Sequence, residues 1–390
     1  MLNAKYLAGI FLVVAAAAAG WFILGATIGV RTQTSDGAQR GALGGLWGSS
    51  LVQDAPWFEA ITAGKHTHES EIAAAGSDVD VDLALELRRK GLLWYNTYAV
   101  VFSGTYRIAM PNRAIVRMTF LLPSETATYD DVVVLVDGRR VGTAGDASGL
   151  VVEIPAGAAR SSTITVRYGS RGLGTWRYRF GKTVVAAHDV RFAVHTNFKA
   201  IDFPANTLAP TTEQPTAKGW DLGWRYRELV TGAGIGMTFP LPLQPGPLAQ
   251  RITFWAPLSL MFYVFVMLVI TTLRRIELHP VNYLFLAAAF FAFHLLFAYT
   301  VDRIRVEYAF GLCAVVSMAL TISYLRLVVG LRFAAVEAAA AQFFYLILFS
   351  YALFDEGYSG LSITIGAIVT LFVTMQLTGR IRWSERFAKA

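Results

Sequence analysis

The sequence predicts a membrane protein with six spanning α-helices and an extracytoplasmic antiparallel β-sandwich domain. Its composition is 55% hydrophobic and only 16% charged, which is apolar for a soluble protein. The apolar residues gather in one stretch near the start and in a nearly continuous series after residue 250. Between these regions the hydrophobic period becomes that of β-strands. The expected domains are a signal-anchor helix (1–31), a periplasmic β-rich domain (32–250), a five-helix membrane domain (251–379) and a basic cytoplasmic tail (380–390).

Six segments reach the length of about 20 apolar residues that a helix needs to cross a bilayer. The first contains a run of alanines, Ala15 to Ala19, that resembles a signal-peptide cleavage region. Apolar residues continue past it through Leu24, so we expect an uncleaved signal anchor. The predicted spans are 6–30, 252–273, 281–301, 306–329, 333–354 and 361–378.

The short loops between these spans differ in charge. One set contains Arg274, Arg275 and the arginine-rich tail, whereas the other includes the acidic pair Asp355 and Glu356. Cytoplasmic loops carry the excess of arginine and lysine, so both termini are expected in the cytoplasm and residues 32–250 in the periplasm of a bacterial inner membrane. This placement explains much of the net charge of +7. No basic run interleaved with aromatic residues indicates nucleic-acid binding.

Short segments rich in Val, Ile, Thr, Phe and Tyr predict strands within residues 32–250. Asp137-Gly138 lies between two apolar runs and predicts a two-residue hairpin, because both residues tolerate positive φ angles. Residues 70–90 are compatible with a helix or an irregular lead-in, and residues 202–247 are expected to return the chain to the membrane. Regular turns between short strands favour a sandwich. The predicted strands are 93–108, 114–122, 131–136, 150–154, 163–168, 175–180 and 190–194.

Three polar residues in the predicted spans are candidates for a site, because ionisable and polar groups are costly in hydrocarbon. His294 lies in the middle of its helix, where a neutral imidazole bonded to a neighbouring helix is the simpler interpretation. Glu337, near Arg332, is expected to pair or to extend towards water, and Gln342 is similar.

Several acidic and histidine patterns resemble metal sites but lack the required spacing. The alternating aspartates at 78, 80 and 82 fail as a calcium loop, because Leu83 and Arg89 occupy the glycine and glutamate positions. His188 and His195 are expected on opposite faces of one strand. A further pattern comprises His66, His68, Glu69 and Glu71. No cofactor is expected, and Cys313, the only cysteine, cannot form a disulfide within the chain.

A Gly-x-Ser-Gly string, from Gly357 to Gly360, resembles the nucleophile motif of rhomboid intramembrane proteases. A serine nucleophile needs a base within hydrogen-bond reach. No histidine follows Ser359, so a glycine-rich turn is the favoured interpretation.

Four local strings, together with the order of one span, a long insert and a helical block, resemble the CreD-like inner-membrane proteins. The resemblance implies an inner-membrane protein associated with envelope integrity and tolerance of certain colicins, and it transfers no catalytic residue. The strings are Leu46-Trp47-Gly48 with Gln53 and Pro56, Arg89-Lys90-Gly91, His279-Pro280-Val281-Asn282-Tyr283-Leu284, and Arg380-Ile381-Arg382-Trp383.

Two classes of function follow. The leading hypothesis is a non-enzymatic envelope protein, anchored in the lipid bilayer, whose sandwich contacts another envelope or membrane protein, including as a subunit of a larger complex. The alternative is a membrane enzyme or transporter that uses His294, Glu337 and Gln342 inside the helical bundle.

Overall fold

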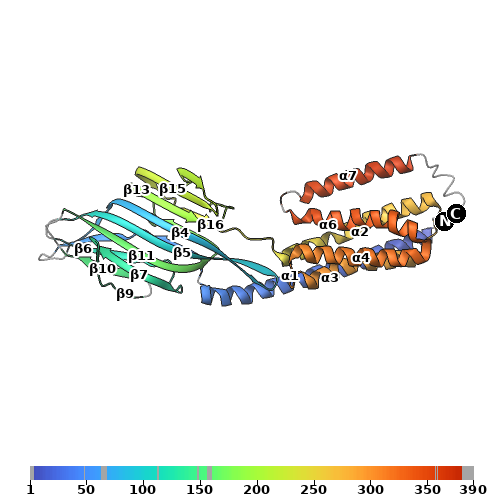
Figure 1. Ribbon diagram of the computed structural model, residues 1–390, viewed down its shortest axis with the longest axis horizontal. Helices are drawn as coiled ribbons and strands as arrows, with labels where there is room; N and C mark the ends of the chain where they lie inside the picture. Colours follow the sequence, from blue (N-terminus) through green and yellow to red (C-terminus); the bar gives the residue numbers. More distant parts are fainter. Residues whose placement is uncertain are drawn as a thin grey trace. The chain divides into compact units, whose positions relative to one another are not determined.

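The chain divides into two compact units in the computed structural model, which describes residues 4–47, 49–62, 68–111, 114–146, 149–155, 160–355, 357 and 359–379 (Figure 1). The helical unit comprises Met1–Gly37, Gly91–Leu93 and Leu243–Ala390. The β-rich unit comprises Ala38–Lys90 and Trp94–Pro242.

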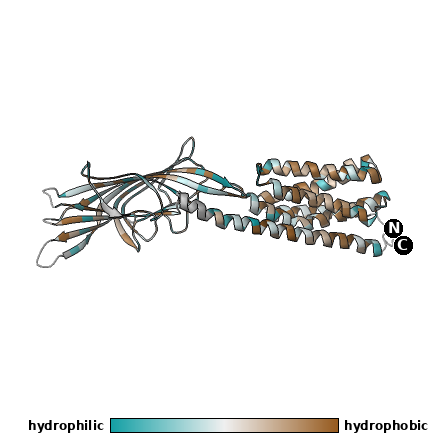
Figure 2. Cartoon of the chain, turned by 90° about the horizontal axis from the view of Figure 1, so that it is seen from below, coloured by the Kyte–Doolittle hydropathy of each residue, from teal (hydrophilic) through white to brown (hydrophobic). Residues whose placement is uncertain are grey.

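The helical unit contains the six predicted spans. Among the described residues, six helices are long and apolar enough to cross a membrane, which confirms that prediction, and apolar residues cover them (Figure 2). The first helix continues past Arg31 and ends at Trp47. The helices are α1 (Ala4–Trp47), α2 (Pro245–Arg274), α3 (Pro280–Thr300), α4 (Val306–Val329) and α7 (Ser359–Thr378).

The fifth span, Phe333–Phe354, is not a uniform α-helix. Two π-helical segments enclose a single α-helical turn, and the span ends in a 3₁₀ turn. Such wide turns are rare and frequently occur at functional sites. The pieces are η1 (Phe333–Ala338), α5 (Ala339–Gln342), η2 (Phe343–Leu348), α6 (Phe349–Tyr351) and η3 (Ala352–Phe354).

Glycines allow α1 to pack against α2 and α3. A Cβ atom added to Gly25 would lie 3.0 Å from the Phe254 ring, and one added to Gly29 would lie 2.4 Å from the Gln250 amide. Small residues four apart let helix backbones approach closely in a membrane. Gly25 and Gly29 therefore form the docking face of α1 on α2.

The tip of a long β-hairpin belongs to the helical unit. The hairpin strands are β4 (Ala74–Lys90) and β5 (Leu93–Ala109), and Gly91 between them has a positive φ of 57°. Leu92 is buried in the helical core, where its carbonyl accepts a hydrogen bond from the Gly246 N–H at 3.0 Å. The Arg89-Lys90-Gly91 string is therefore the turn that leads into this packed leucine.

The strands of the β-rich unit form three sheets. A three-stranded sheet has the order β1-β12-β16, a five-stranded sheet β3-β2-β6-β10-β9, and an eight-stranded sheet β14-β15-β13-β4-β5-β11-β7-β8. The remaining strands are β1 (Leu51–Asp54), β2 (Trp57–Thr62), β3 (His68–Ile72), β6 (Ile115–Leu121), β7 (Tyr129–Val136), β8 (Arg139–Arg140), β9 (Ala144–Asp146), β10 (Gly149–Ile154), β11 (Ser161–Leu173), β12 (Thr175–Arg179), β13 (Val185–Thr196), β14 (Thr212–Pro215), β15 (Trp220–Thr231) and β16 (Ile235–Thr238).

All seven predicted strands are present, and the predicted hairpin joins β7 to β8. Asp137 and Gly138 have φ angles of 48° and 78°, as its tight turn requires. Side chains from the five-stranded sheet, such as Phe58 and Met118, share one buried core with Phe102 and Val166 of the eight-stranded sheet. The β-rich unit therefore has a core of its own.

Two expectations about this unit are wrong, and a third is incomplete. Residues 70–90 form no helix, because Val79, Val81 and Leu83 alternate with exposed aspartates and fill the core side of β4. Residues 202–247 lead into α2, as expected, but they also contain three strands, β14 to β16. The sheets are not wholly antiparallel, since β1 pairs with β12 and β4 with β13 in parallel. Alternation fixes the buried face of a strand but not the direction of its neighbour.

Candidate functional site

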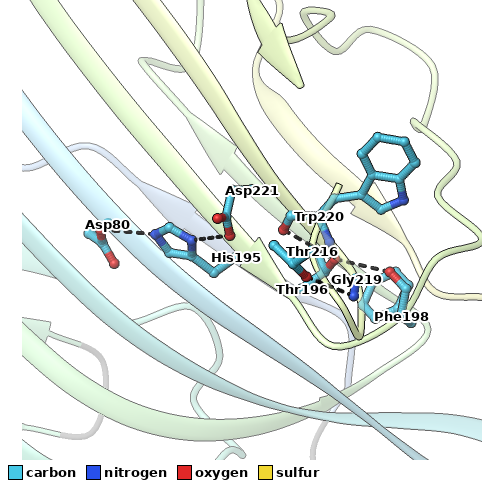
Figure 3. A network of polar contacts seen from close by, with 8 residues as sticks. All are labelled: Asp80, His195, Thr196, Phe198, Thr216, Gly219, Trp220 and Asp221. Atoms are coloured by element: carbon cyan, nitrogen blue, oxygen red, sulfur yellow. Dashed lines mark hydrogen bonds and ion pairs between the residues drawn. The ribbon is translucent and has the colours of Figure 1, made fainter. Parts of the chain in front are cut away.

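An ionic cluster lies on the outer face of the eight-stranded sheet, where β4, β13 and β15 run side by side (Figure 3). His195 of β13 is central. Its Nδ1 lies 2.7 Å from Asp221 Oδ1 on β15, and its Nε2 lies 3.4 Å from Asp80 Oδ2 on β4. The imidazole is 39% exposed. We call His195, Asp80 and Asp221 the His195 cluster.

A turn beside the cluster holds β13 against β15. The Thr196 hydroxyl donates to the Phe198 carbonyl at 3.0 Å and accepts from the Trp220 N–H at 2.9 Å (Figure 3). The Gly219 N–H donates to the Thr216 hydroxyl at 2.9 Å. Because Thr196 and Trp220 directly follow and precede His195 and Asp221 in sequence, these bonds fix the spacing of the ionic pair.

The hydrogen bond to Asp221 raises the pKa of His195 above its ordinary value of 6.5, and the nearby Asp80 acts in the same direction. A raised pKa means that the folded protein holds the imidazolium more tightly than the unfolded chain does. The contribution of His195 to stability is therefore complete below pH 6.5 and is lost as pH rises through the raised pKa.

We expect the unfolding temperature of the β-rich unit to fall more between about pH 6 and pH 8.5 in the wild-type chain than in His195→Gln. Circular dichroism at a β-sheet wavelength, recorded on the full chain in detergent at several pH values, measures this difference. Identical pH profiles for the two proteins would contradict the assignment.

The three intramembrane candidates do not form one site. His294 is buried on α3, where its Nδ1 lies 3.0 Å from the Phe290 carbonyl and its ring meets the Trp21 ring at 5.5 Å. A carbonyl only accepts, so Nδ1 donates this bond, and Nε2 is buried with no hydrogen-bond partner among the described residues. No hydrogen bond among the described residues joins His294 to Glu337 or Gln342.

Glu337 and Gln342 connect the fifth span to two other helices. Glu337 pairs with Arg274 of α2 at 2.7 Å, rather than with Arg332. Gln342 Nε2 donates to the Ser317 hydroxyl of α4 at 2.8 Å, and Ser317 donates to the Ala289 carbonyl at 2.7 Å. These bonds fix the position of the fifth span.

Gln53 has a structural role. It is fully buried, and its Nε2 donates to the carbonyls of Asp54 and Leu121 at 2.6 and 3.0 Å. The Tyr168 hydroxyl donates to its Oε1 at 2.8 Å. Burial raises the pKa of this tyrosine.

Pro56 lies between β1 and β2, where the chain passes from one sheet to another and needs no ladder N–H. Trp47 ends α1, and its side chain is outside the described set. Gly48, Trp383 and the rest of the 380–390 tail also lie outside the described residues.

The His279-Pro280 string starts α3. The His279 side chain accepts from the Val281 N–H at 3.3 Å, and Pro280 occupies the first turn, where its missing N–H costs nothing. Tyr283 is fully buried, and its ring packs edge-on against Tyr6 of α1 at 6.4 Å. The string therefore joins α3 to the start of α1.

The weaker motifs gain no support. Within the described ranges, no group of three His, Cys, Asp or Glu residues could hold a metal ion, and His66 lies outside those ranges. The Ser359 hydroxyl donates a hydrogen bond to the Asp355 carbonyl in the turn that starts α7. Tyr358 and Glu356 lie outside the described residues.

The sequence interpretation did not identify the cluster around His195. Asp221 lies within residues 202–247, the segment that the sequence predicts to return the chain to the membrane. The available signal was the period-two pattern of β15, in which Leu222 and Trp224 are buried and the intervening residues are less so.

Comparison with known proteins gives one family match. The family model described as "Inner membrane protein CreD" matches residues 191–384, about half of the chain. No curated protein matches. A proposed nutrient binding protein from Legionella pneumophila is 12% identical with a TM-score of 0.33, covering 52% of this chain and 74% of its own. An M1 zinc metallopeptidase from Deinococcus radiodurans is 14% identical with a TM-score of 0.25, covering 43% of each chain.

Proposed function

Since this chain belongs to the CreD family of inner membrane proteins, we propose that it is a non-enzymatic, membrane-anchored binding protein. Its β-rich unit contacts another envelope or membrane protein, and its helical unit holds that contact at the bilayer. The role served is envelope integrity, as the family resemblance implies.

The observation that carries this proposal is the division of the chain. The β-rich unit, Ala38–Lys90 and Trp94–Pro242, has its own aromatic and aliphatic core, formed separately from the six apolar helices. A unit of that size is far more than an anchor requires, and it presents exposed sheet faces to a partner. The shared core of the five- and eight-stranded sheets supports a sandwich as its architecture.

The charge of the loops supports the proposed orientation. Arg274 is the last residue of α2 and Arg275 follows it, whereas Asp355 follows the fifth span. Counting the spans along the chain puts the end of α2 and the end of the fifth span on opposite sides of a membrane. The positive-inside rule then places the α2 end in the cytoplasm and the β-rich unit in the periplasm.

In-cell photo-crosslinking tests the binding role. A photoreactive residue at Val101, which is 55% exposed on β5, is expected to yield a protein adduct of discrete mass. The matched control is Val315, which is 68% exposed on α4 and is expected to face lipid. The absence of adducts from positions across both large sheets, or a periplasmic probe that fails to reach a tag inserted after Gly138, would refute the proposal.

A further inference from the structure

The outer face of the five-stranded sheet combines an exposed tryptophan with carboxylates. Strand β2 shows the pattern, because Phe58 and Ala60 are buried in the core while Trp57, Glu59 and Ile61 alternate with them on the other face. Trp57 is 53% exposed, although tryptophan is a highly buried residue on average. Strand β2 therefore presents an indole, a carboxylate and an aliphatic side chain in line.

The neighbouring strands extend the carboxylate of β2 into an acidic row. Cross-strand pairing places Glu71 of β3 directly opposite Glu59, and Arg117 of β6 opposite Glu59 on its other side. Glu153 of β10 lies opposite Arg117 in turn. Glu69 is two residues from Glu71 and shares its face. Four carboxylates thus surround the guanidinium of Arg117 on this face.

The ion pairs of this face leave two of the carboxylates without a cation. Arg117 contacts Glu69 at 3.6 Å and Glu153 at 3.2 Å through its two terminal nitrogens. No ion pair within the described part of the chain engages Glu59 or Glu71, which lie directly opposite each other. Like charges in that position destabilise a sheet. A cation placed between these two side chains would remove the repulsion.

The indole beside the two carboxylates selects the kind of cation. Trp57 precedes Glu59 by two residues, so the two side chains stand about 6.6 Å apart along the same face. A guanidinium is planar, binds a carboxylate through two parallel hydrogen bonds and stacks on an indole. An ammonium ion or a metal ion makes no use of that combination. The surface therefore matches an arginine side chain.

Exposed aliphatic side chains flank this position on β6. Ile115 is 40% exposed and lies opposite Ile61, and Leu121 is 39% exposed near the other end of the strand. An ionic anchor with apolar contacts around it is the usual arrangement of a protein interface, in which tryptophan and arginine contribute most of the binding energy.

We propose that this face docks a segment of a partner protein through an arginine, which lies between Glu59 and Glu71 and stacks on Trp57. Apolar residues next to that arginine contact Ile115 and Leu121. The inference rests on the binding role proposed above and deepens it, because it names the docking surface and the chemistry of the partner.

A fluorescein-labelled peptide of alternating valine and arginine tests this surface. Fluorescence anisotropy with the full chain in a neutral detergent measures its affinity, and the same peptide with citrulline in place of arginine keeps the shape but removes the charge. We expect saturable binding of the arginine peptide and at least about tenfold weaker binding of the citrulline peptide. Combining Glu59→Gln with Glu71→Gln is expected to weaken the arginine peptide by a similar factor. Trp57→Leu is expected to weaken it without a change of charge.

The matched control combines Asp78→Asn with Asp82→Asn. Both aspartates are exposed on β4 of the eight-stranded sheet, so this variant loses the same charge from another face of the β-rich unit. Its affinity for the arginine peptide is expected to equal that of the wild type. The proposal is overturned if arginine and citrulline peptides bind equally, or if the two glutamate substitutions have no effect. A loss of equal size in the aspartate control would also overturn it, because general charge attraction would then account for binding.

This experiment and the crosslinking experiment can fail separately. Protein adducts at Val101 without binding of the arginine peptide would refute this docking face and leave the binding role standing. Arginine-dependent peptide binding without any adduct in cells would refute the binding role while supporting the chemistry of the face.

Discussion

Gly25→Leu is expected to separate α1 from α2 in the helical unit. The glycine Cα faces the Phe254 ring so closely that even a Cβ atom would lie 3.0 Å from it. A leucine side chain adds three further carbons at the same point. Forcing extra atoms into a packed contact costs about 1–3 kcal/mol, and in a bilayer no hydrophobic gain between the helices compensates for the lost approach.

The measurement is the unfolding temperature of the full chain in detergent, together with the protease sensitivity of α1. Gly311→Leu is the matched control, because Gly311 lies within α4 and a Cβ atom there would meet nothing within 4 Å. The control is expected to behave like the wild type. If both variants were equally stable, the glycines of α1 would not form its docking face.

The spans and most strands could be predicted because their signals are local. A lipid-length apolar run has few alternatives, and all six predicted spans correspond to long apolar helices in the described chain. The Asp137-Gly138 hairpin was predictable for a similar reason, since two adjacent residues with positive φ define the turn. Both inferences need only neighbouring residues.

Contacts between residues that lie far apart in the chain could not be predicted from the sequence. Asp80 and Asp221 meet at His195 because β4 and β15 flank β13, and the parallel pairing of β4 with β13 has no local signature. The aspartates of β4 disfavoured a strand by propensity, although Val79 and Val81 alternated with them as a strand requires. Core burial of the valines outweighed that propensity.

The contacts of the intramembrane residues were likewise not predictable from the sequence. The sequence alone identified His294, Glu337 and Gln342, because polar residues stand out in apolar runs. It could not identify the residues to which they bond. Gln342 bonds to Ser317 and Glu337 to Arg274, each on a different helix. Ser317 gave no signal because hydroxyls in membrane helices usually bond to their own backbone.

Gly219→Ala is expected to destabilise the β-rich unit strongly and to dismantle the His195 cluster. A Cβ atom on Gly219 would lie 2.0 Å from the Thr196 backbone oxygen, which no change of side-chain rotamer can relieve. The backbone must move, and the bonds from Gly219 to Thr216 and from Trp220 to Thr196 move with it. We expect a loss of about 3 kcal/mol, which corresponds to roughly 6–12 °C in a unit of this size.

Two measurements separate this mechanism from general damage. Gly142→Ala is the control in the same unit, since a Cβ atom there would meet nothing within 4 Å, and its unfolding temperature should not change. In Gly219→Ala the spacing between β13 and β15 at Asp221 is disturbed, so the pH dependence assigned to His195 should disappear along with the stability. A variant that unfolds earlier but keeps the wild-type pH profile would show that the turn does not position the ionic pair.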